Sequence, residues 1–176
     1  MLFRSLVAAR LEGVRGIILA GSPWSVYDDG APVPDKTVYT LGVPVLGICY
    51  GAQRMTHDHG GRVATLADRE YGKRPVKVTE ADPLFAGVPS SFQSWMSHGD
   101  SIERMAPGFR AVAATDNGVP AAIVHDTLPL RGVQFHPEVT HCEHGMEILA
   151  NFVFGICGCA KDRKSTRLNS SHGKLS

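Results

Sequence analysis

A cysteine between two glycines is the residue of this sequence whose surroundings most strongly suggest chemistry. Residues 43–47 (Val-Pro-Val-Leu-Gly) are too few for a helix and typical of a buried strand, and the pattern Gly47-x-Cys49-x-Gly51 follows at once. A Gly-x-nucleophile-x-Gly turn between a strand and a helix is a nucleophile elbow, which leaves no room for side chains two positions either side of the nucleophile. A helix starting near Tyr50 would point its N-terminus at Cys49, which predicts a thiol with a favoured thiolate.

The same pattern also fits a buried structural cysteine, so a partner residue has to decide between the two interpretations. Residues 130–135 form a predicted strand that leads into His136 and, two residues later, Glu138. Residues i and i+2 of an extended chain share a face, so Glu138 could orient the imidazole of His136 while His136 faces Cys49. These three side chains are therefore candidates for the nucleophile, the base and the orienting carboxylate of a catalytic triad.

Several motifs together resemble a known family. Residues 47–53 (Gly-Ile-Cys-Tyr-Gly-Ala-Gln) and 134–140 (Gln-Phe-His-Pro-Glu-Val-Thr) resemble the class I glutamine amidotransferases. Residues 96–100 (Met-Ser-His-Gly-Asp) and 139–141 (Val-Thr-His) are similar to the glutaminase domains of GMP synthases. The resemblance extends from about residue 16 to residue 158, with the motifs in the order that the family shows.

The resemblance implies hydrolysis of glutamine to glutamate and ammonia through a Cys-His-Glu triad. Cys49 would attack the side-chain amide carbon, His136 would carry the proton to the leaving ammonia, and Glu138 would hold the tautomer of His136. The implied oxyanion hole consists of the backbone N–H groups of Tyr50 and Ser22. The implied substrate contacts, which include a clamping loop at residues 97–100, are Gly21, Gln53, Ser97, His98, Gly99 and Asp100.

The turn at Gly21-Ser22-Pro23 departs from the family, which has Gly-Gly-Pro there. A backbone donor survives this change if Ser22 can adopt the required conformation. If the turn demands a positive φ, Ser22 would be strained by about 1–3 kcal/mol.

The implied partner is an ATP-pyrophosphatase, or synthetase, domain or subunit that uses the ammonia to aminate XMP to GMP. This chain has neither a Ser-Gly-Gly-Val-Asp-Ser-type loop nor a Gly-x-x-x-x-Gly-Lys-[Ser/Thr] loop. ATP and Mg²⁺ are therefore expected only in the synthetase, and no cofactor or metal is expected in this chain. Two alternatives stay open: another Cys-His-Glu amidotransferase or γ-glutamyl hydrolase of the same fold, and an inactive fragment.

The composition is that of one globular domain with no preference for nucleic acid or membranes. Of 176 residues, 43% are hydrophobic and 20% are charged, and 18 basic residues against 17 acidic ones leave a net charge of +1. No stretch is apolar for long enough to span a bilayer. The four cysteines, at positions 49, 142, 157 and 159, include the candidate nucleophile, which favours a reducing, cytoplasmic location over a disulfide framework.

The order of the apolar segments predicts an α/β fold. We expect a mostly parallel, flavodoxin-like sheet of the class I amidotransferase type, with helices on both faces and a small antiparallel extension. The expected strands are residues 16–20, 43–47, 62–66, 74–79, 92–96, 110–114, 121–125 and 130–135. The expected helices are residues 1–13, 35–41, 50–59 and 145–157, the last with a core face of Met146, Leu149, Ala150, Val153 and Ile156.

The two ends of the chain differ from the family pattern. Residues 1–159 are interpreted as the amidotransferase domain without the family's first strand and helix, a deficit of roughly forty residues against usual domain sizes. Residues 160–176 show no apolar period and are predicted to be an unrelated, disordered tail.

Overall fold

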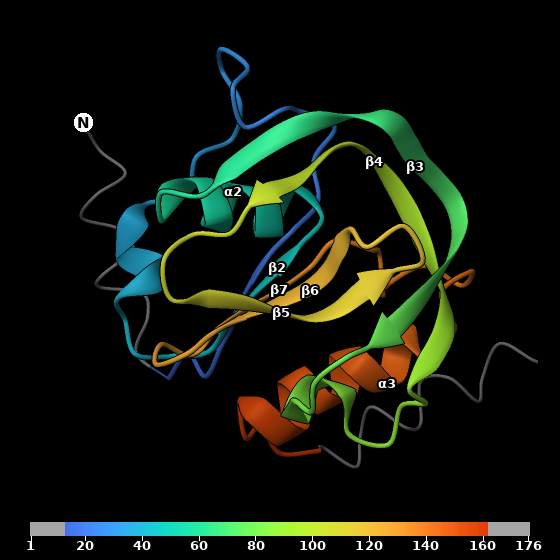
Figure 1. Cartoon of the computed structure of the whole chain (residues 1–176). Coiled ribbons are helices and arrows are strands. Elements are labelled where there is room, and N and C mark those ends of the chain that lie inside the picture. Colours follow the sequence, from blue (N-terminus) through green and yellow to red (C-terminus); the bar gives the residue numbers. More distant parts are fainter. Residues whose placement is uncertain (1–12, 162–176) are drawn as a thin grey trace, which may run out of the picture.

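The computed structural model of this chain describes residues 13–161, and for residues 66–70 the backbone alone (Figure 1). The expected helix at residues 1–13 and nearly all of the expected tail lie outside this range. The described strands are β1 (Ile17–Leu19), β2 (Val45–Ile48), β3 (Arg62–Val78), β4 (Ser91–Arg104), β5 (Phe109–Thr115), β6 (Pro120–His125) and β7 (Leu130–Val133).

In the described part of the chain these strands form one seven-stranded sheet in the order β1-β2-β7-β6-β5-β3-β4. Strands β1, β2 and β7 pair in parallel, whereas the pairs that join β7 to β6, β6 to β5, β5 to β3 and β3 to β4 are antiparallel. The α/β class is confirmed, but the antiparallel part is larger than the small extension expected. Parallel neighbours need a long crossover, whereas short turns connect β5 to β6 and β6 to β7.

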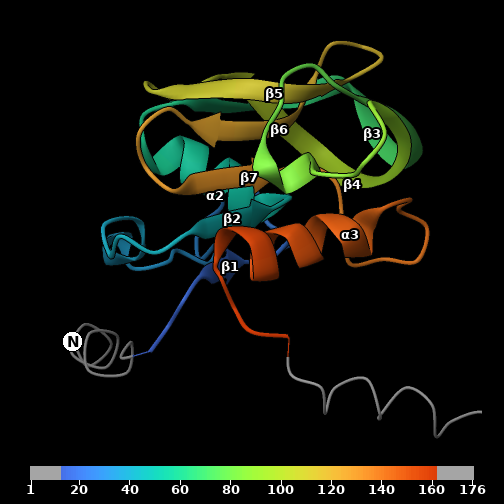
Figure 2. The same ribbon diagram turned by 90° about the horizontal axis from the view of Figure 1, so that it is seen from below.

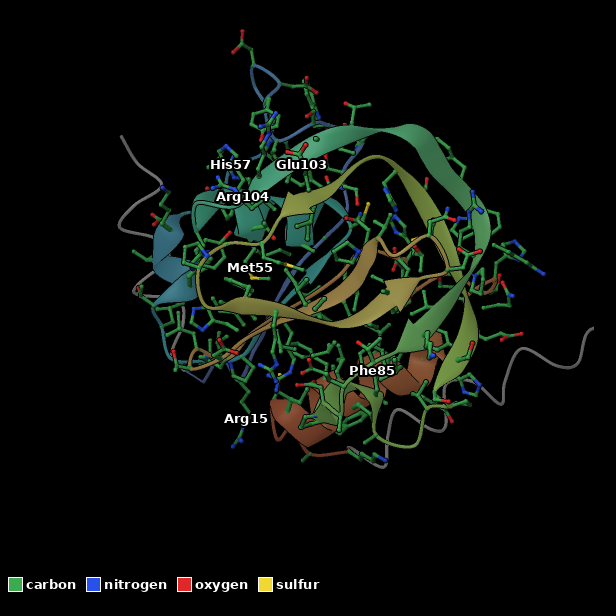
Figure 3. All side chains as sticks on the ribbon, in the orientation of Figure 1. Arg15, Met55, His57, Phe85, Glu103 and Arg104 are labelled. Atoms are coloured by element: carbon green, nitrogen blue, oxygen red, sulfur yellow. The ribbon has the colours of Figure 1, made fainter. Side chains whose placement is uncertain are left out.

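Two helices cover opposite faces of the sheet (Figures 1 and 2). Helix α2 spans Tyr50–Asp58, and helix α3 (Gly145–Ala150) continues as one turn of π-helix, η3 (Asn151–Ile156). Figure 3 shows Met55 on the α2 side and Phe85 on the α3 side of the sheet. The short 3₁₀ helices are η1 (Lys36–Tyr39), which the Asp35 side chain caps, and η2 (Pro83–Phe85).

Strand β2 is buried on both faces because it lies between these two helical layers. Val45 packs in the cluster that contains Met55 of α2, while Leu46 and Ile48 pack in the cluster that contains Phe152 of η3. Burial on both faces explains why the β2 sequence is a continuous apolar run and does not alternate. The strand that leads to Cys49 is therefore fixed in the centre of the core.

The three short strands expected at 62–66, 74–79 and 92–96 are confirmed in position, but their bounds are wrong, because they are parts of two long strands. Strands β3 and β4 form one antiparallel pair that arches across the molecule (Figure 1). The polar middle of β3 has weak strand propensity. After a register shift between Thr65 and Glu70, its backbone nevertheless pairs with β4. Backbone pairing to β4 thus overrides local propensity here.

The last helix shows a different buried face from the predicted one. Ile148 and Phe152 are 0% and 1% exposed, whereas Met146 is 71% exposed. Leu149, Val153 and Ile156 lie at the partly buried edge of the same core cluster. Met146 belongs to the first turn, and the π-helical turn after residue 150 breaks the 3.6-residue period on which the prediction relied.

Candidate active site

The turn at Cys49 has the geometry of a nucleophile elbow. Cys49 connects β2 to α2 with φ of 51° and ψ of −109°. A Cβ atom built on Gly47 would lie 2.6 Å from the backbone N of Ala52, and one on Gly51 would lie 2.1 Å from the carbonyl O of Leu19. Both glycines of the Gly-x-Cys-x-Gly pattern are therefore required by backbone contacts, as the sequence predicts. A non-glycine residue at positive φ is strained, and such strain is concentrated at functional sites.

The Cys49 thiol is buried, with 3% of the residue exposed. Its Sγ donates to the carbonyl O of Ser97 at 4.0 Å and accepts from Nε2 of Gln134 at 3.8 Å. The pKa of Cys49 is raised to about 11, mainly by burial; the hydrogen bond from the Tyr50 backbone N–H acts to lower it, and the charge of Glu138 contributes to the rise. The expected thiolate is thus wrong for the resting site, because desolvation outweighs the helix N-terminus.

His136 and Glu138 form the expected pair, although in a turn beyond the end of β7. The strand ends at Val133 and not at residue 135. His136 Nδ1 lies 2.7 Å from Glu138 Oε1, and the His136 backbone N–H donates to the carbonyl O of Trp95 at 2.9 Å. The imidazole is therefore held by a carboxylate at one nitrogen, while its backbone is anchored to β4.

Gly21 shows that the histidine and the cysteine converge. A Cβ atom on Gly21 would lie 2.9 Å from His136 Cε1 and 3.6 Å from Cys49 Cβ. The three residues follow the carboxyl ends of β1, β2 and β7, which are neighbours in the parallel part of the sheet. This edge is where open α/β sheets bind their ligands.

A cavity of about 450 Å³ opens beside Cys49. It is lined by residues from β4, from the start of α2 and from the segment after β1. Among them are Cys49 and the predicted site residues Ser22, Gln53, Ser97, His98, Gly99 and Asp100. Residues 97–100 belong to strand β4, so the clamping loop expected there is wrong as a loop, although these residues do face the cavity.

Ser22 takes up an ordinary backbone conformation. In the described part of the chain, the non-glycine residues with positive φ are Cys49 and His144. The strain considered for Ser22 is therefore not present. Its Oγ accepts from the Trp24 backbone N–H at 3.4 Å, which closes a small turn at the edge of the cavity.

Two buried amides connect the cavity wall to the sulfur. Gln53 Nε2 donates to the carbonyl O of Asp100 at 2.7 Å and to Gln134 Oε1 at 3.3 Å, and Gln134 Nε2 donates to Cys49 Sγ. Gln53 and Gln134 are 3% and 1% exposed. No role was predicted for Gln134, although a polar residue in an otherwise buried run was a signal that could have found it.

The carboxylate of Asp100 is held in place at the cavity. Its Oδ2 accepts from the hydroxyl of Ser25 at 2.6 Å, and its Oδ1 accepts from the hydroxyl of Thr65 at 2.8 Å. Asp28 adds a second carboxylate to the lining. Among the lining residues whose side chains the structure describes there is no lysine or arginine, so the cavity favours a ligand with a cationic group.

Two further properties concern the described residues alone. No group of three or more His, Cys, Asp and Glu side chains within residues 13–161 is placed to hold a metal ion. In the same range, no helix has both the length and the apolar character needed to cross a membrane.

Stability should fall as the pH rises from about 9 to about 11. The pKa of Cys49 is raised from 9.0 to about 11 in the folded chain, so the folded form keeps a proton that the unfolded form loses above pH 9. A difference of about two pKa units corresponds to about 2–3 kcal/mol of folding stability. This contribution is fully present below the pKa of the unfolded chain, and it is lost as the pH rises through the pKa of the folded chain. Urea unfolding at about pH 8 and about pH 10.5 would measure this loss.

The matched variant for this prediction is Cys49→Ala. Burial also raises the pKa values of Cys142 and Tyr39, so some loss of stability should remain in the variant. The fall in unfolding free energy between the two pH values should be smaller in Cys49→Ala than in the parent chain. An equal fall in unfolding free energy in both proteins would contradict the raised pKa of Cys49.

Comparison with known proteins is consistent with this geometry. Residues 4–156 match the family model described as glutamine amidotransferase class-I. The chain is 49% identical over 152 residues to a GMP synthase [glutamine-hydrolyzing] of Caldicellulosiruptor saccharolyticus, covering 86% of this chain and 30% of that protein. It is 46% identical over 147 residues to the protein of the same name from Aquifex aeolicus, covering 84% and 29%.

Solved structures show the same fold. A protein from Thermoplasma acidophilum, described as one of the subunits of a GMP synthase, has a TM-score of 0.76 and 29% identity, covering 93% of this chain and 80% of that one. A glutamine amidotransferase from Thermotoga maritima has a TM-score of 0.63 at 19% identity, covering 93% and 68%, which shows the fold alone. The chain spans about 30% of the length of the two curated relatives named above.

Proposed function

Because this chain belongs to the class I glutamine amidotransferases, we propose that it hydrolyses glutamine with Cys49, His136 and Glu138 as its catalytic triad. The observation that carries this proposal is the convergence of Cys49 and the His136–Glu138 pair at Gly21, beside the 450 Å³ cavity. A nucleophile that lines a cavity, with a base and an orienting carboxylate converging behind it, supplies the parts that acyl transfer requires.

The raised pKa of Cys49 determines how the reaction begins. A neutral thiol is a weak nucleophile, so His136 takes its proton as Sγ attacks the side-chain amide carbon of glutamine. His136 then gives this proton to the leaving ammonia, and a γ-glutamyl thioester remains on Cys49. Water, activated by His136, hydrolyses the thioester to glutamate and restores the thiol.

The backbone and the acidic lining supply the other contacts. The backbone N–H of Tyr50 forms a hydrogen bond with the Cys49 thiol. Together with the backbone N–H of Ser22, it would stabilise the oxyanion. Asp28 and Asp100 would attract the cationic α-amino group of glutamine. Ser97, His98, Gly99 and Gly21 line or adjoin the same cavity and would complete the amino-acid subsite.

We further propose that the ammonia passes to an ATP-dependent synthetase, a separate subunit or another domain, which aminates XMP to GMP in the cytoplasm. The names of the relatives support this step, because they are GMP synthases that hydrolyse glutamine. Another amidotransferase or a γ-glutamyl hydrolase of the same fold is the alternative. A panel of γ-glutamyl substrates separates them, because a γ-glutamyl hydrolase would prefer γ-glutamyl peptides to free glutamine.

The 176-residue chain alone should release glutamate slowly and make no GMP, because its sequence has no nucleotide-binding loop. Adding a synthetase subunit from a two-subunit relative, with ATP and XMP, should raise glutamate release by about tenfold, the size of a typical coupling between sites. Glutamate release would be measured with each component left out in turn. Full GMP formation by the chain alone, or the absence of glutaminase activity under every condition, would contradict the proposal.

A further inference from the structure

We propose that Gln134 is a positioning residue for the nucleophile, and that Gln53 acts through it. The two amides form a single directed chain that begins at the Asp100 carbonyl and ends at the Cys49 sulfur. The proposal goes beyond the triad, because it names a buried donor to the sulfur that does not line the cavity. It rests on the proposed function only for its effect on turnover.

The direction of the chain follows from its first member. The carbonyl of Asp100 can only accept, so at 2.7 Å the Gln53 amide must turn its NH₂ group towards it. The second hydrogen of that NH₂ group goes to Gln134 Oε1. Gln134 must therefore present its own NH₂ group to Cys49 Sγ, which makes it a donor to the sulfur.

A donor at this place acts more strongly on the thiolate than on the thiol. A hydrogen bond to a charged group is stronger than one to a neutral group, and low local polarity strengthens both. Gln134 is 1% exposed and does not line the cavity, so water does not compete for its NH₂ group. Gln134 therefore offsets part of the desolvation of the thiolate and fixes the sulfur against rotation.

Gln53 lines the cavity, where a substrate contact is expected of it, but its NH₂ group is used elsewhere. Both hydrogens of its NH₂ group are committed to Asp100 and Gln134, which leaves only its Oε1 for a ligand in the cavity. The principal effect of Gln53 on the reaction would then be to hold Gln134 in the donor orientation.

The test is the pH dependence of Cys49 alkylation by iodoacetamide in the full chain, followed by peptide mass spectrometry. Gln134→Met removes the donor at similar volume, and it should move the Cys49 midpoint up by about one pH unit, with about tenfold slower alkylation at pH 8. Gln134→Glu puts a carboxylate beside the sulfur and should move the midpoint further. Gln53→Met should produce a smaller shift in the same direction.

Two controls separate positioning from loss of structure. Asn151→Leu removes a side-chain amide that donates to the carbonyls of Leu84 and Ala86, on the α3 side of the sheet, and it should leave the Cys49 midpoint in place. Cys142 is an internal control, because its buried thiol contacts Glu143 and not Gln134. Its alkylation should stay slow in every folded variant.

An unchanged Cys49 midpoint in Gln134→Met, with Cys142 still protected, would overturn the proposal. If Cys142 becomes reactive in that variant, the fold has loosened, and Gln134→Glu, which keeps the shape of the side chain, decides in the same way. With glutamine as substrate, Gln134→Met should lower kcat about tenfold and leave KM nearly unchanged. Because alkylation needs no glutamine, a shifted midpoint without any glutaminase activity would support the positioning role and reject the proposed function.

Discussion

Replacing Cys49 with alanine should abolish glutamine hydrolysis, with a loss of at least about a thousandfold relative to the parent chain. The sulfur is the group that bonds to the substrate carbon, so without it no thioester forms. The assay is glutamate release under the condition in which the parent chain is most active. A glutamine-like chloroketone should label Cys49 in the parent chain, and label concentrated on Cys142 or Cys157 would reject the assignment.

Glu138→Ala is the informative comparison for this prediction. Glu138 is hydrogen-bonded to His136 Nδ1, and in the proposed reaction it does not contact the substrate carbon. Its loss should therefore leave measurable residual activity. The activity of His136→Ala should be nearly as low as that of Cys49→Ala, because the members of a triad act as a unit. Small and equal losses from Cys49→Ala and Glu138→Ala would contradict the triad.

Gly51→Val should cost at least about 3 kcal/mol of folding stability, at the upper end of what overpacking does. Even the first added carbon, Cβ, would lie 2.1 Å from the Leu19 carbonyl O and 2.7 Å from the carbonyl carbon. Backbone cannot move aside as a flexible side chain can, so β1 and α2 would have to separate. Thermal unfolding followed by circular dichroism would measure the loss.

The matched control for this substitution is Gly155→Val. A Cβ atom on Gly155 has nothing within 4 Å, and the residue has no positive φ. The control should therefore change stability by less than about 1 kcal/mol. Equal losses at both positions would show that the close approach of Gly51 to Leu19 does not determine the stability of the elbow.

The elbow could be predicted from sequence because its cause is local. The spacing of Gly47, Cys49 and Gly51 is itself the requirement of the tight turn, and the structure places a backbone atom against each glycine. The pairing of His136 with Glu138 was also local, since they are two positions apart, even though a turn and not a strand brings them together.

The features that the sequence did not predict depend on partners distant in the chain. The polar middle of β3 forms a strand only because β4 pairs with it, and residues 97–100 lie in β4 for the same reason. The pKa of Cys49 depends on burial by the folded chain, which the position of Cys49 at a helix N-terminus does not reveal. Gln134 gains its role from Gln53, which lies 81 residues earlier in the chain.

The bond between Gln53 and the Asp100 carbonyl has an evolutionary consequence. The acceptor belongs to the backbone, so any residue at position 100 that preserves the strand would present it, while the Asp100 carboxylate bonds Ser25 and Thr65 separately. Selection can therefore exchange the Asp100 side chain at the cavity without disturbing the hydrogen-bonded chain of Gln53 and Gln134 that ends at the nucleophile. A scaffold of this kind can acquire new ligand preferences while its reactive sulfur keeps the same support.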